Sequence, residues 1–189
     1  MREILFRGQT RRKGERVWMN GEPVESNWVY GGVFVGAGDY SIIYTYDPID
    51  KFPVYSDTVG QYTGLHDATK WESLTEKEQQ ELLRNHKKED WNGRQIFEGD
   101  IIRYNTYDDF DCYSVVKFGE YEQDGSSGEY NPMDCVGWYA EVYSFTCPDW
   151  AENDPIYFND YLKQQNLLEV NLECEIIGNI YDNPELRGI

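Results

Sequence analysis

The pattern of hydrophobic and polar positions along the chain predicts strands more often than helices. Seven short segments are rich in β-branched or aromatic residues and are bounded by Gly, Asp, Asn or Pro, which interrupt strands. These segments are 2–7, 28–35, 41–46, 97–104, 113–118, 136–145 and 172–181. Their number and shortness indicate an α+β protein, mainly β, that is built from antiparallel sheets.

The last of these segments has the clearest alternation of apolar and polar residues. The apolar positions are Leu172, Cys174 and Ile176, and polar residues stand between them. This is the pattern of a strand with one buried face and one face in water. Gly178 follows in the same segment, where it allows a bulge or close packing against another part of the chain.

Segment 74–88 interrupts the strand pattern and predicts a helix. The Thr75 hydroxyl can accept a hydrogen bond from the amide of Glu78, while the Glu78 carboxylate reaches back to Thr75, which together form a capping box. Acidic residues occupy the first half of the segment and basic residues the second half, which suits the helix dipole. Its few leucines predict a helix on the surface with a narrow contact stripe.

Two weaker patterns lie further along the chain. Asp154 before Pro155 supplies an N-cap and a proline at the first helical position, which predicts a helix over 155–165. Segment 123–129 reads Gln-Asp-Gly-Ser-Ser-Gly-Glu, a composition typical of turns and linkers, and is expected to be a mobile loop.

The charge of the chain is strongly negative and unevenly distributed. Its 189 residues include 17 Lys and Arg against 35 Asp and Glu, a net charge of −18. Residues 1–16 hold six basic and two acidic residues, a net charge of +4, whereas residues 104–160 hold thirteen acidic residues and one basic residue, a net charge of −12. A protein that binds nucleic acid through phosphates needs a basic field, so the body of this chain is not expected to bind nucleic acid.

Neither the apolar runs nor the cysteines indicate a membrane or secreted protein. No run approaches the about 18 apolar residues of a membrane helix, and the start of the chain returns to charge after three of them. The four cysteines form no C-x-x-C pair, and they are Cys112, Cys135, Cys147 and Cys174. We therefore expect a cytoplasmic protein without membrane contact, with reduced, mostly buried cysteines and no zinc site.

Six phrases occur in order along the chain and resemble a known family. They are Leu5-Phe-Arg-Gly8, Trp28-Val-Tyr-Gly31, Thr58-Val-Gly-Gln-Tyr-Thr-Gly-Leu65, Ile96-Phe-Glu-Gly-Asp-Ile-Ile-Arg-Tyr104, Val115-Val-Lys-Phe-Gly-Glu-Tyr121 and Glu175-Ile-Ile-Gly-Asn-Ile-Tyr-Asp-Asn-Pro-Glu-Leu186. Together they resemble the YopX family of phage and prophage proteins, over nearly the whole chain.

The resemblance implies a small α+β protein with an SH3-like barrel in its C-terminal part, found in temperate phages of Gram-positive bacteria and their integrated copies, and so present in the bacterial host cell. It implies no established activity. Compared with shorter members, the chain carries roughly 24 extra residues between Leu65 and Trp91. We therefore predict three parts: a β-rich segment over 1–65, an inserted helical segment over 66–90 and an SH3-like barrel domain over 91–189.

The glycines of the Thr58-Val-Gly-Gln-Tyr-Thr-Gly64 phrase allow two interpretations. Gly60 and Gly64 could present backbone amides to a phosphate. However, the phrase matches neither phosphate-binding glycine pattern, and no basic residue stands between Lys51 and Lys70. The favoured interpretation is that both glycines occupy positive-φ turn positions while the neighbouring apolar side chains pack.

The acidic and histidine motifs are likewise interpreted as structural. Asp100, in the Glu98-Gly-Asp100 turn, is expected to accept backbone amides. The best candidates for a Mg²⁺ or Ca²⁺ site are Asp108, Asp109 and Asp111, but they lack the EF-hand spacing, so an exposed acidic loop is favoured. The two histidines, His66 and His86, have no nucleophile partner in any recognisable motif. We expect no metal, no cofactor and no catalytic residue.

The leading hypothesis is a non-enzymatic accessory protein that binds a protein partner or assembles with itself through an edge strand or the 74–88 helix. Its abundant Tyr and Trp suit contact surfaces. A second hypothesis is that the acidic region 104–160 mimics nucleic acid and inhibits a host DNA-binding protein. A third is that the basic N-terminal stretch around Arg11, Arg12 and Lys13 touches nucleic acid while the acidic region faces away.

Overall fold

The computed structural model divides the chain into two compact units, Met1–Gly64 and Leu65–Ile189. The structure describes residues 4–11, 17–19, 22–24, 27–35, 40–46, 49–83, 87–106, 110–125, 130–146 and 163–188. Each unit is described by itself. The predicted division into three parts stays a prediction.

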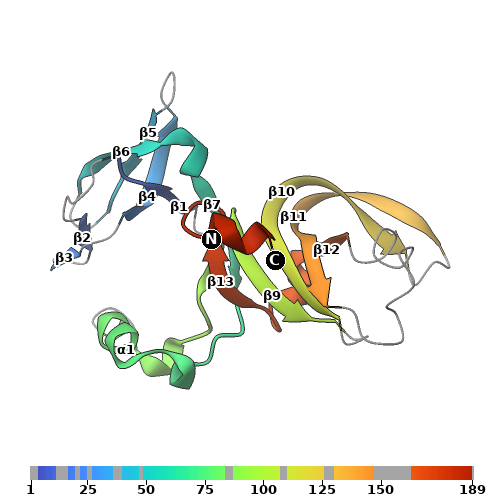
Figure 1. Ribbon diagram of the computed structural model, residues 1–189. Helices are drawn as coiled ribbons and strands as arrows, with labels where there is room; N and C mark the ends of the chain where they lie inside the picture. Colours follow the sequence, from blue (N-terminus) through green and yellow to red (C-terminus); the bar gives the residue numbers. More distant parts are fainter. Residues whose placement is uncertain are drawn as a thin grey trace. The chain divides into compact units, whose positions relative to one another are not determined.

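The first unit is an antiparallel sheet with the strand order β6-β5-β4-β1-β7 (Figure 1). Its strands are β1 (Phe6–Gln9), β4 (Trp28–Val35), β5 (Tyr40–Tyr44), β6 (Lys51–Tyr55) and β7 (Gly60–His66), the last of which ends in the second unit. A separate hairpin joins β2 (Val17–Met19) to β3 (Glu22–Val24), and a 3₁₀ turn, η1 (Ser56–Thr58), follows β6. An isolated bridge between Thr10 and Val54 brings the end of β1 back to the outer edge of β6, so the sheet curves strongly.

The core of the first unit lies on one face of this sheet. It consists of Val29, Ile43, Phe52 and Val54, all at positions that the strand register places on the same side. At Gly31 the backbones of β4 and β5 approach too closely for a side chain, because a Cβ atom there would stand 1.9 Å from the carbonyl oxygen of Tyr44. The glycine is therefore required for β4 and β5 to pack.

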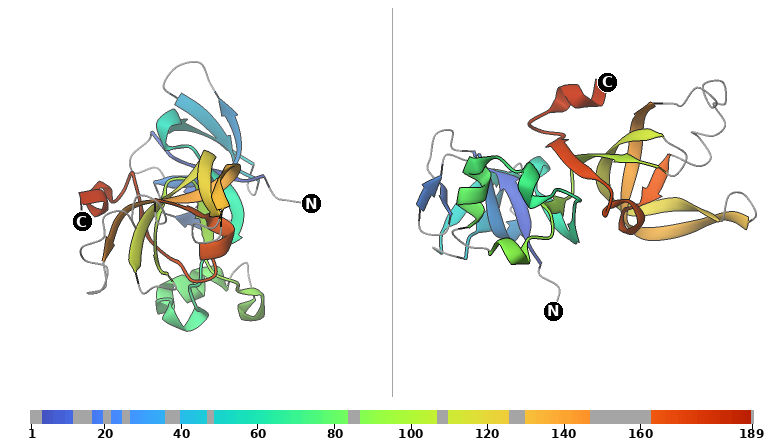
Figure 2. Two further views of the ribbon diagram at one scale, coloured as in Figure 1. Left: turned by 90° about the vertical axis from the view of Figure 1, so that its right-hand side faces the viewer. Right: turned by 90° about the horizontal axis from the view of Figure 1, so that it is seen from below.

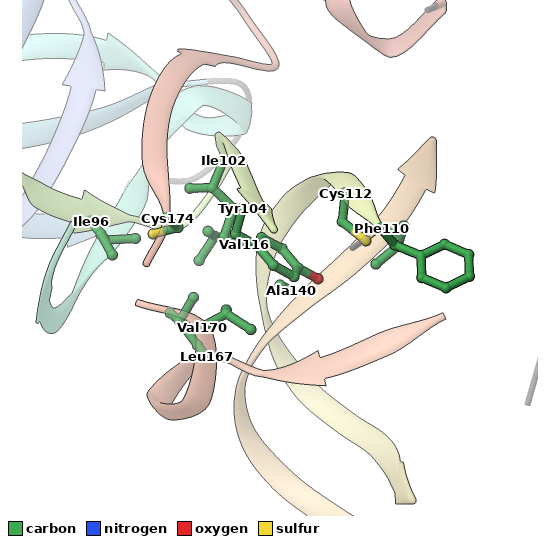
Figure 3. Packing of buried hydrophobic residues seen from close by; sticks show 11 residues of the cluster. Ile96, Ile102, Tyr104, Phe110, Cys112, Val116, Ala140, Leu167, Val170 and Cys174 are labelled. Carbon is green, nitrogen blue, oxygen red and sulfur yellow. The ribbon is translucent and has the colours of Figure 1, made fainter. Parts of the chain in front are cut away.

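The second unit is built around a five-stranded antiparallel sheet of order β12-β11-β10-β9-β13. Its strands are β9 (Asp100–Asn105), β10 (Asp111–Gly125), β11 (Tyr130–Thr146), β12 (Gln164–Asn166) and β13 (Glu175–Asn179), preceded by β8 (Gln95–Phe97). The short helix α3 (Leu167–Val170) follows β12, and the 3₁₀ turn η5 (Pro184–Gly188) follows β13. The core of this unit contains side chains from β8, β9, β10, β11 and α3, together with Phe110 before β10 and Cys174 before β13 (Figure 3).

The expected SH3-like barrel is not confirmed. In the described part of the chain, the hydrogen-bonded strand order ends at β12 on one side and at β13 on the other. The far half of β10 does approach β12, where the amide of Glu122 donates a hydrogen bond of 3.0 Å to the side-chain oxygen of Gln164. A side chain makes this bridge in place of a backbone ladder, so the sheet is not closed.

Within segment 74–88, the described part of the chain forms a helix only as α1 (Glu76–Leu82), between the 3₁₀ turns η2 (Trp71–Ser73) and η3 (Lys88–Asp90). Lys87 and Lys88, which were expected in the basic second half of the helix, lie beyond its end. The capping box is confirmed, because the Glu78 amide donates to the Thr75 hydroxyl at 3.3 Å and the Glu78 carboxylate accepts from the Thr75 amide at 2.8 Å. Arg94 forms an ion pair with the Glu78 carboxylate at 2.7 Å. The helix therefore contacts the segment that leads into β8 in its own unit.

Several sequence predictions need correction. Leu172 was expected on a buried face but is 77% exposed, because residues 171–173 form a turn after α3 and the strand begins only at Glu175. The loop expected over 123–129 begins later, since β10 and β11 continue to pair through Gly125 and Tyr130, and residues 126–129 lie outside the described residues. Most of the helix expected over 155–165 also lies outside them, and its last two residues belong to β12.

Candidate functional site

The candidate metal loop is only partly within the described residues. Asp108 and Asp109 lie outside them, and Asp111 begins β10. Both carboxylate oxygens of Asp111 accept from Arg103, at 3.0 Å from Nε and 2.8 Å from the guanidinium NH2 group, and this hydrogen bonding raises the pKa of Arg103. No group of three His, Cys, Asp or Glu side chains comes together among the described residues. Asp111 therefore has a partner that competes with any metal.

The two glycines of the candidate phosphate loop have different roles. Gly64 has the positive φ that the interpretation predicts, 85°, but it lies within strand β7 and not in a turn. The prediction that Gly60 occupies a positive-φ turn position is wrong, because Gly60 begins β7 and pairs with Arg7 of β1. The segment is thus mainly a strand, in which the amides of Gly60 and its neighbours belong to a sheet.

The Asp100 turn is structural, as expected. Its carboxylate is almost fully buried and accepts a hydrogen bond of 2.8 Å from the amide of Phe97. Gly99, with a φ of 81°, donates its amide to the carbonyl of Val116 at 2.9 Å and accepts from the amide of Ile180 at 3.0 Å. The turn therefore joins β8 and β9 to β10 and to the chain after β13.

A buried acidic residue that the sequence analysis missed organises the second unit. Asp67 is 3% exposed, and its carboxylate accepts from the Thr69 amide and hydroxyl at 3.0 and 2.6 Å, from the Arg94 amide at 2.7 Å and from the Ile176 amide at 3.1 Å. These four hydrogen bonds join the end of β7, the start of β8 and β13. The only local signal was the sequence Asp-Ala-Thr, which is typical of an Asx-type turn. That sequence does not reveal the two distant donors, the amides of Arg94 and Ile176.

The histidine next to this carboxylate contacts two asparagine side chains. Burial lowers the pKa of the His66 imidazole, and the charge of Asp67 opposes this shift. The Nδ1 atom of His66 lies 3.3 Å from the side-chain amide of Asn92, while the His66 carbonyl accepts from the side-chain amide of Asn171 at 3.2 Å. His66 is thus engaged in holding the chain around Asp67, and His86 lies outside the described residues.

Two of the cysteines are fully buried. Cys112 and Cys174 belong to the core of the second unit, where desolvation raises each thiol pKa to about 12. Cys135 is half-buried, and Cys147 lies outside the described residues. The expectation of reduced, buried cysteines is confirmed for Cys112 and Cys174.

The best candidate for a functional surface is the paired ribbon formed by β10 and β11. The two strands stay paired over almost their whole length, whereas β9 pairs with β10 only up to Val115 (Figure 1). In Figure 2 the ribbon, coloured yellow to light orange, extends beyond the other strands of this unit. The part of the ribbon beyond Val115 is therefore a two-stranded projection. The rest of the sheet does not cover both of its faces.

One face of this projection carries exposed apolar residues beside carboxylates. Strand register and period-two alternation place six side chains on it, and we call them the ribbon surface: Phe118, Glu120, Glu122, Asp134, Val136 and Trp138. Phe118 and Val136 are 56% and 71% exposed, and the Phe118 and Trp138 rings meet edge to face with centroids 5.0 Å apart. The three carboxylates form no ion pair with any described residue.

The other face of the projection is covered. The Tyr121 and Tyr139 rings stack with centroids 5.2 Å apart, and both side chains are buried. The side chain of Gln123 donates to Glu169 of α3 at 2.8 Å, which connects this face to the helix. The ribbon is thus held on one side and presents the ribbon surface on the other.

The model of the family described as YopX protein matches residues 70–187. This chain belongs to the YopX family. The matched segment begins five residues after the start of the second unit and includes α1, the five-stranded sheet and the ribbon surface. No curated protein and no solved structure matches the chain.

No helix in the described part of the chain is both long and apolar enough to cross a membrane.

Proposed function

We propose that this YopX protein is a non-enzymatic binding protein that uses the ribbon surface to contact a protein partner with a basic and partly apolar face. The proposal includes a cytoplasmic location in a bacterium that carries the phage or prophage. One observation carries the proposal: exposed aromatic and aliphatic side chains stand among carboxylates on a projecting ribbon.

The apolar residues support a contact surface. Phe118 pairs with Trp138 and Val136 pairs with Glu120, so Phe118 and Val136 are diagonal neighbours on one face. The Trp138 ring contacts the Phe118 ring edge to face from the neighbouring strand. Contiguous exposed apolar residues commonly mark a site of interaction. Aromatic side chains at the centre of an interface contribute most of its binding energy when water is excluded by a polar rim.

The charge supports a basic partner over a second copy of the chain. Residues 65–189 contain ten basic and 27 acidic residues, a net charge of −17. Two ribbon surfaces placed face to face would bring six carboxylates together without a compensating cation, which opposes association. A basic partner would pair with these carboxylates at the rim while its apolar side chains cover Phe118 and Val136.

The titratable groups support a non-enzymatic role. The Asp67 carboxylate accepts four hydrogen bonds from the chain, Asp111 is paired with Arg103, and the buried Cys112 and Cys174 have strongly raised pKa values. Catalytic groups need access to a substrate and a pKa suited to proton transfer or nucleophilic attack. These buried or paired groups serve the fold.

A capture experiment with matched variants tests the proposal. The wild-type protein, a Phe118→Ser/Val136→Ser variant and a Leu172→Ser variant are immobilised and exposed to extract from cells that carry the gene. Leu172 is 77% exposed and lies in the turn after α3, so its variant removes an exposed apolar residue outside the ribbon surface. We expect one partner to bind the wild type and Leu172→Ser but to be lost from the ribbon variant. The proposal is contradicted if all three proteins capture the partner equally, or if none of them captures a partner.

The acidity of the second unit also favours a narrower version, in which the partner is a DNA-binding protein and the carboxylates occupy its DNA site. In that case, added duplex DNA competes with this chain for the captured partner, and competition weakens as salt is raised. Capture that is insensitive to duplex DNA would exclude mimicry while leaving the protein-binding proposal intact. Light scattering of the purified protein tests the self-assembly alternative.

A further inference from the structure

The outward face of the first unit carries exposed aromatic residues on three neighbouring strands. Phe34 of β4 pairs with Ile42 of β5, which pairs with Pro53 of β6. Because side chains alternate along a strand, Phe34, Tyr44 and Tyr55 point to the same side of the sheet. The core residues occupy the alternate positions and point to the opposite side.

A fourth ring lies on the same face. A Cβ atom at Gly32, which would point outward beside Phe34, would stand 3.2 Å from the hydroxyl of Tyr46. The hydroxyl end of the Tyr46 side chain therefore lies over the glycine. Tyr46 is 65% exposed, compared with 60% for Phe34. We call Phe34, Tyr44, Tyr46 and Tyr55 the aromatic face. Diagonal neighbours such as Phe34 and Tyr44 are about 7 to 8 Å apart in a sheet.

The charged residues on this face are basic. The guanidinium of Arg11 lies over the Tyr55 ring, 5.2 Å from its centroid, and Lys51 stands two residues before Pro53 on the outward side of β6. No carboxylate occupies an outward position on the described residues of β4, β5 and β6. Asp50 directly precedes Lys51 in the sequence, and its carboxylate accepts a hydrogen bond of 2.7 Å from the backbone amide of Lys51.

The two units also differ sharply in net charge. Residues 1–64 contain seven basic and eight acidic residues, a net charge of −1, so almost all of the −18 belongs to the second unit. The repulsion that excludes nucleic acid from the body of the protein is therefore largely absent from the unit that carries the aromatic face.

We propose that the aromatic face binds single-stranded nucleic acid by stacking bases on its rings. Proteins that bind single strands without sequence preference combine aromatic platforms with cations that follow the backbone. Here four exposed rings supply the stacking surface, and Arg11 and Lys51 supply positive charge at its β6 side. This activity goes beyond the proposed function and resides in the other unit, so the two can fail separately.

The same features argue against a duplex. Paired bases in a duplex present no free ring face for stacking, and duplex binding without base contacts depends on many phosphate contacts. Two cations cannot supply them. For single strands, each neutralised phosphate contributes about −0.7 to the slope of log K against log salt, so two cations predict a slope of only about −1.4.

Fluorescence anisotropy of labelled oligothymidylate and oligouridylate tests the proposal. Each oligonucleotide has about 20 nucleotides, because small domains that bind single strands cover about 4 to 16 nucleotides each. We expect both to bind the full chain with the shallow salt dependence above, and a duplex of equal length to bind at least about tenfold more weakly. Replacing Phe34 and Tyr44 together by Ala should weaken single-strand binding at least about tenfold, since each stacked base is worth about 1 to 3 kcal/mol.

Two controls make the test specific. The Phe118→Ser/Val136→Ser variant, which alters the ribbon surface, should bind the oligonucleotides like wild type, and circular dichroism should show that every variant keeps the native strand signal. Absence of binding up to about 100 µM protein, the weak end of non-specific affinity, overturns the proposal. The proposal is also overturned if the Phe34→Ala/Tyr44→Ala variant binds the oligonucleotides as tightly as the wild type does. It is likewise overturned if the aromatic face binds cellohexaose or a proline-rich peptide in preference to the oligonucleotides.

Discussion

The backbone amide of Ile176 donates a hydrogen bond of 3.1 Å to the carboxylate of Asp67, a residue 109 positions earlier in the chain. The same carboxylate accepts the amide of Arg94 at 2.7 Å, so a single buried side chain joins the entry to β8 with β13. Hydrogen bonds to a charged acceptor are stronger than those between neutral groups, and leaving buried donors unpaired is costly. Asp67 is therefore central to the stability of the second unit.

Replacing Asp67 by Asn is expected to destabilise the protein strongly. The substitution keeps one oxygen but turns an NH2 group toward backbone donors, which should lower the free energy of unfolding by about 2 to 4 kcal/mol. Urea denaturation should show a lower midpoint with an unchanged slope. The matched control is Asp134→Asn on the exposed ribbon surface, which should change stability by less than about 0.5 kcal/mol. Similar effects for the two variants would falsify this role of Asp67.

Gly93 should tolerate no side chain. Its φ is 104°, and a Cβ atom would stand 1.9 Å from the carbonyl oxygen of Asp67. Gly93→Ala should therefore cost at least about 2 kcal/mol, from the left-handed backbone and the clash together. Gly137→Ala is the control, because no heavy atom lies within 4 Å of its Cβ position. Thermal unfolding should show a large drop in Tm for the first variant only, and an unaltered Tm for Gly93→Ala would contradict this geometry.

The capping box makes part of the stability of the segment around α1 depend on pH. Hydrogen bonds from Thr75, with a further contribution from Arg94, lower the pKa of Glu78 below its ordinary value of 4.5. A lowered folded-state pKa stabilises the fold above the unfolded value, and this contribution disappears as pH falls through the folded value. Glu78→Gln should thus lower stability by about 0.5 to 1 kcal/mol at neutral pH, with the partial exposure of the pair keeping the effect small.

Urea denaturation of wild type and Glu78→Gln at a series of pH values measures this difference. It should be constant from neutrality down to about pH 5 and should shrink toward zero in stronger acid. A difference that stays the same at low pH would mean that the glutamate acts by packing alone.

Cys112 and Cys174 should resist alkylation in the folded protein. With a pKa of about 12, only about one thiol in 10⁴ is ionised at pH 8, and both side chains are fully buried. Mass spectrometry after brief treatment with iodoacetamide should find these two residues unmodified in the native state and modified in guanidinium chloride. Rapid native labelling of either one would show that the core of the second unit opens readily.

How far the sequence could predict this structure depends on the distance between interacting residues. The capping box was predictable, because Thr75 and Glu78 lie within one helical turn and satisfy each other. The limits of β4 were also predictable, because a dense run of aromatic and β-branched residues begins at Trp28 and ends at Val35. Leu172 was misassigned because the polar–apolar alternation continued through a turn, where backbone hydrogen bonds to Val170 replace the ladder.

The candidate surfaces were less predictable than the strands that carry them. Phe118 and Val136 are 18 residues apart, and only the register of β10 against β11 shows that they share a face. Shifting that register by one residue would move Val136 to the opposite side of the ribbon. The aromatic face has the same origin, because it requires three strands to be in register and Tyr46 to lie over Gly32.

The sequence by itself determined that the chain is mainly β, carries a capped helix after Thr75, resembles the YopX family and concentrates negative charge away from its N-terminus. These properties follow from composition, local periodicity and hydrogen bonds between near neighbours. Only the tertiary structure decided that Asp67 is a buried acceptor for distant amides, that Gly60 belongs to a strand and that apolar residues gather on the ribbon surface and the aromatic face. The physical reason is that pairing between strands distant in sequence sets which groups meet and which stay exposed.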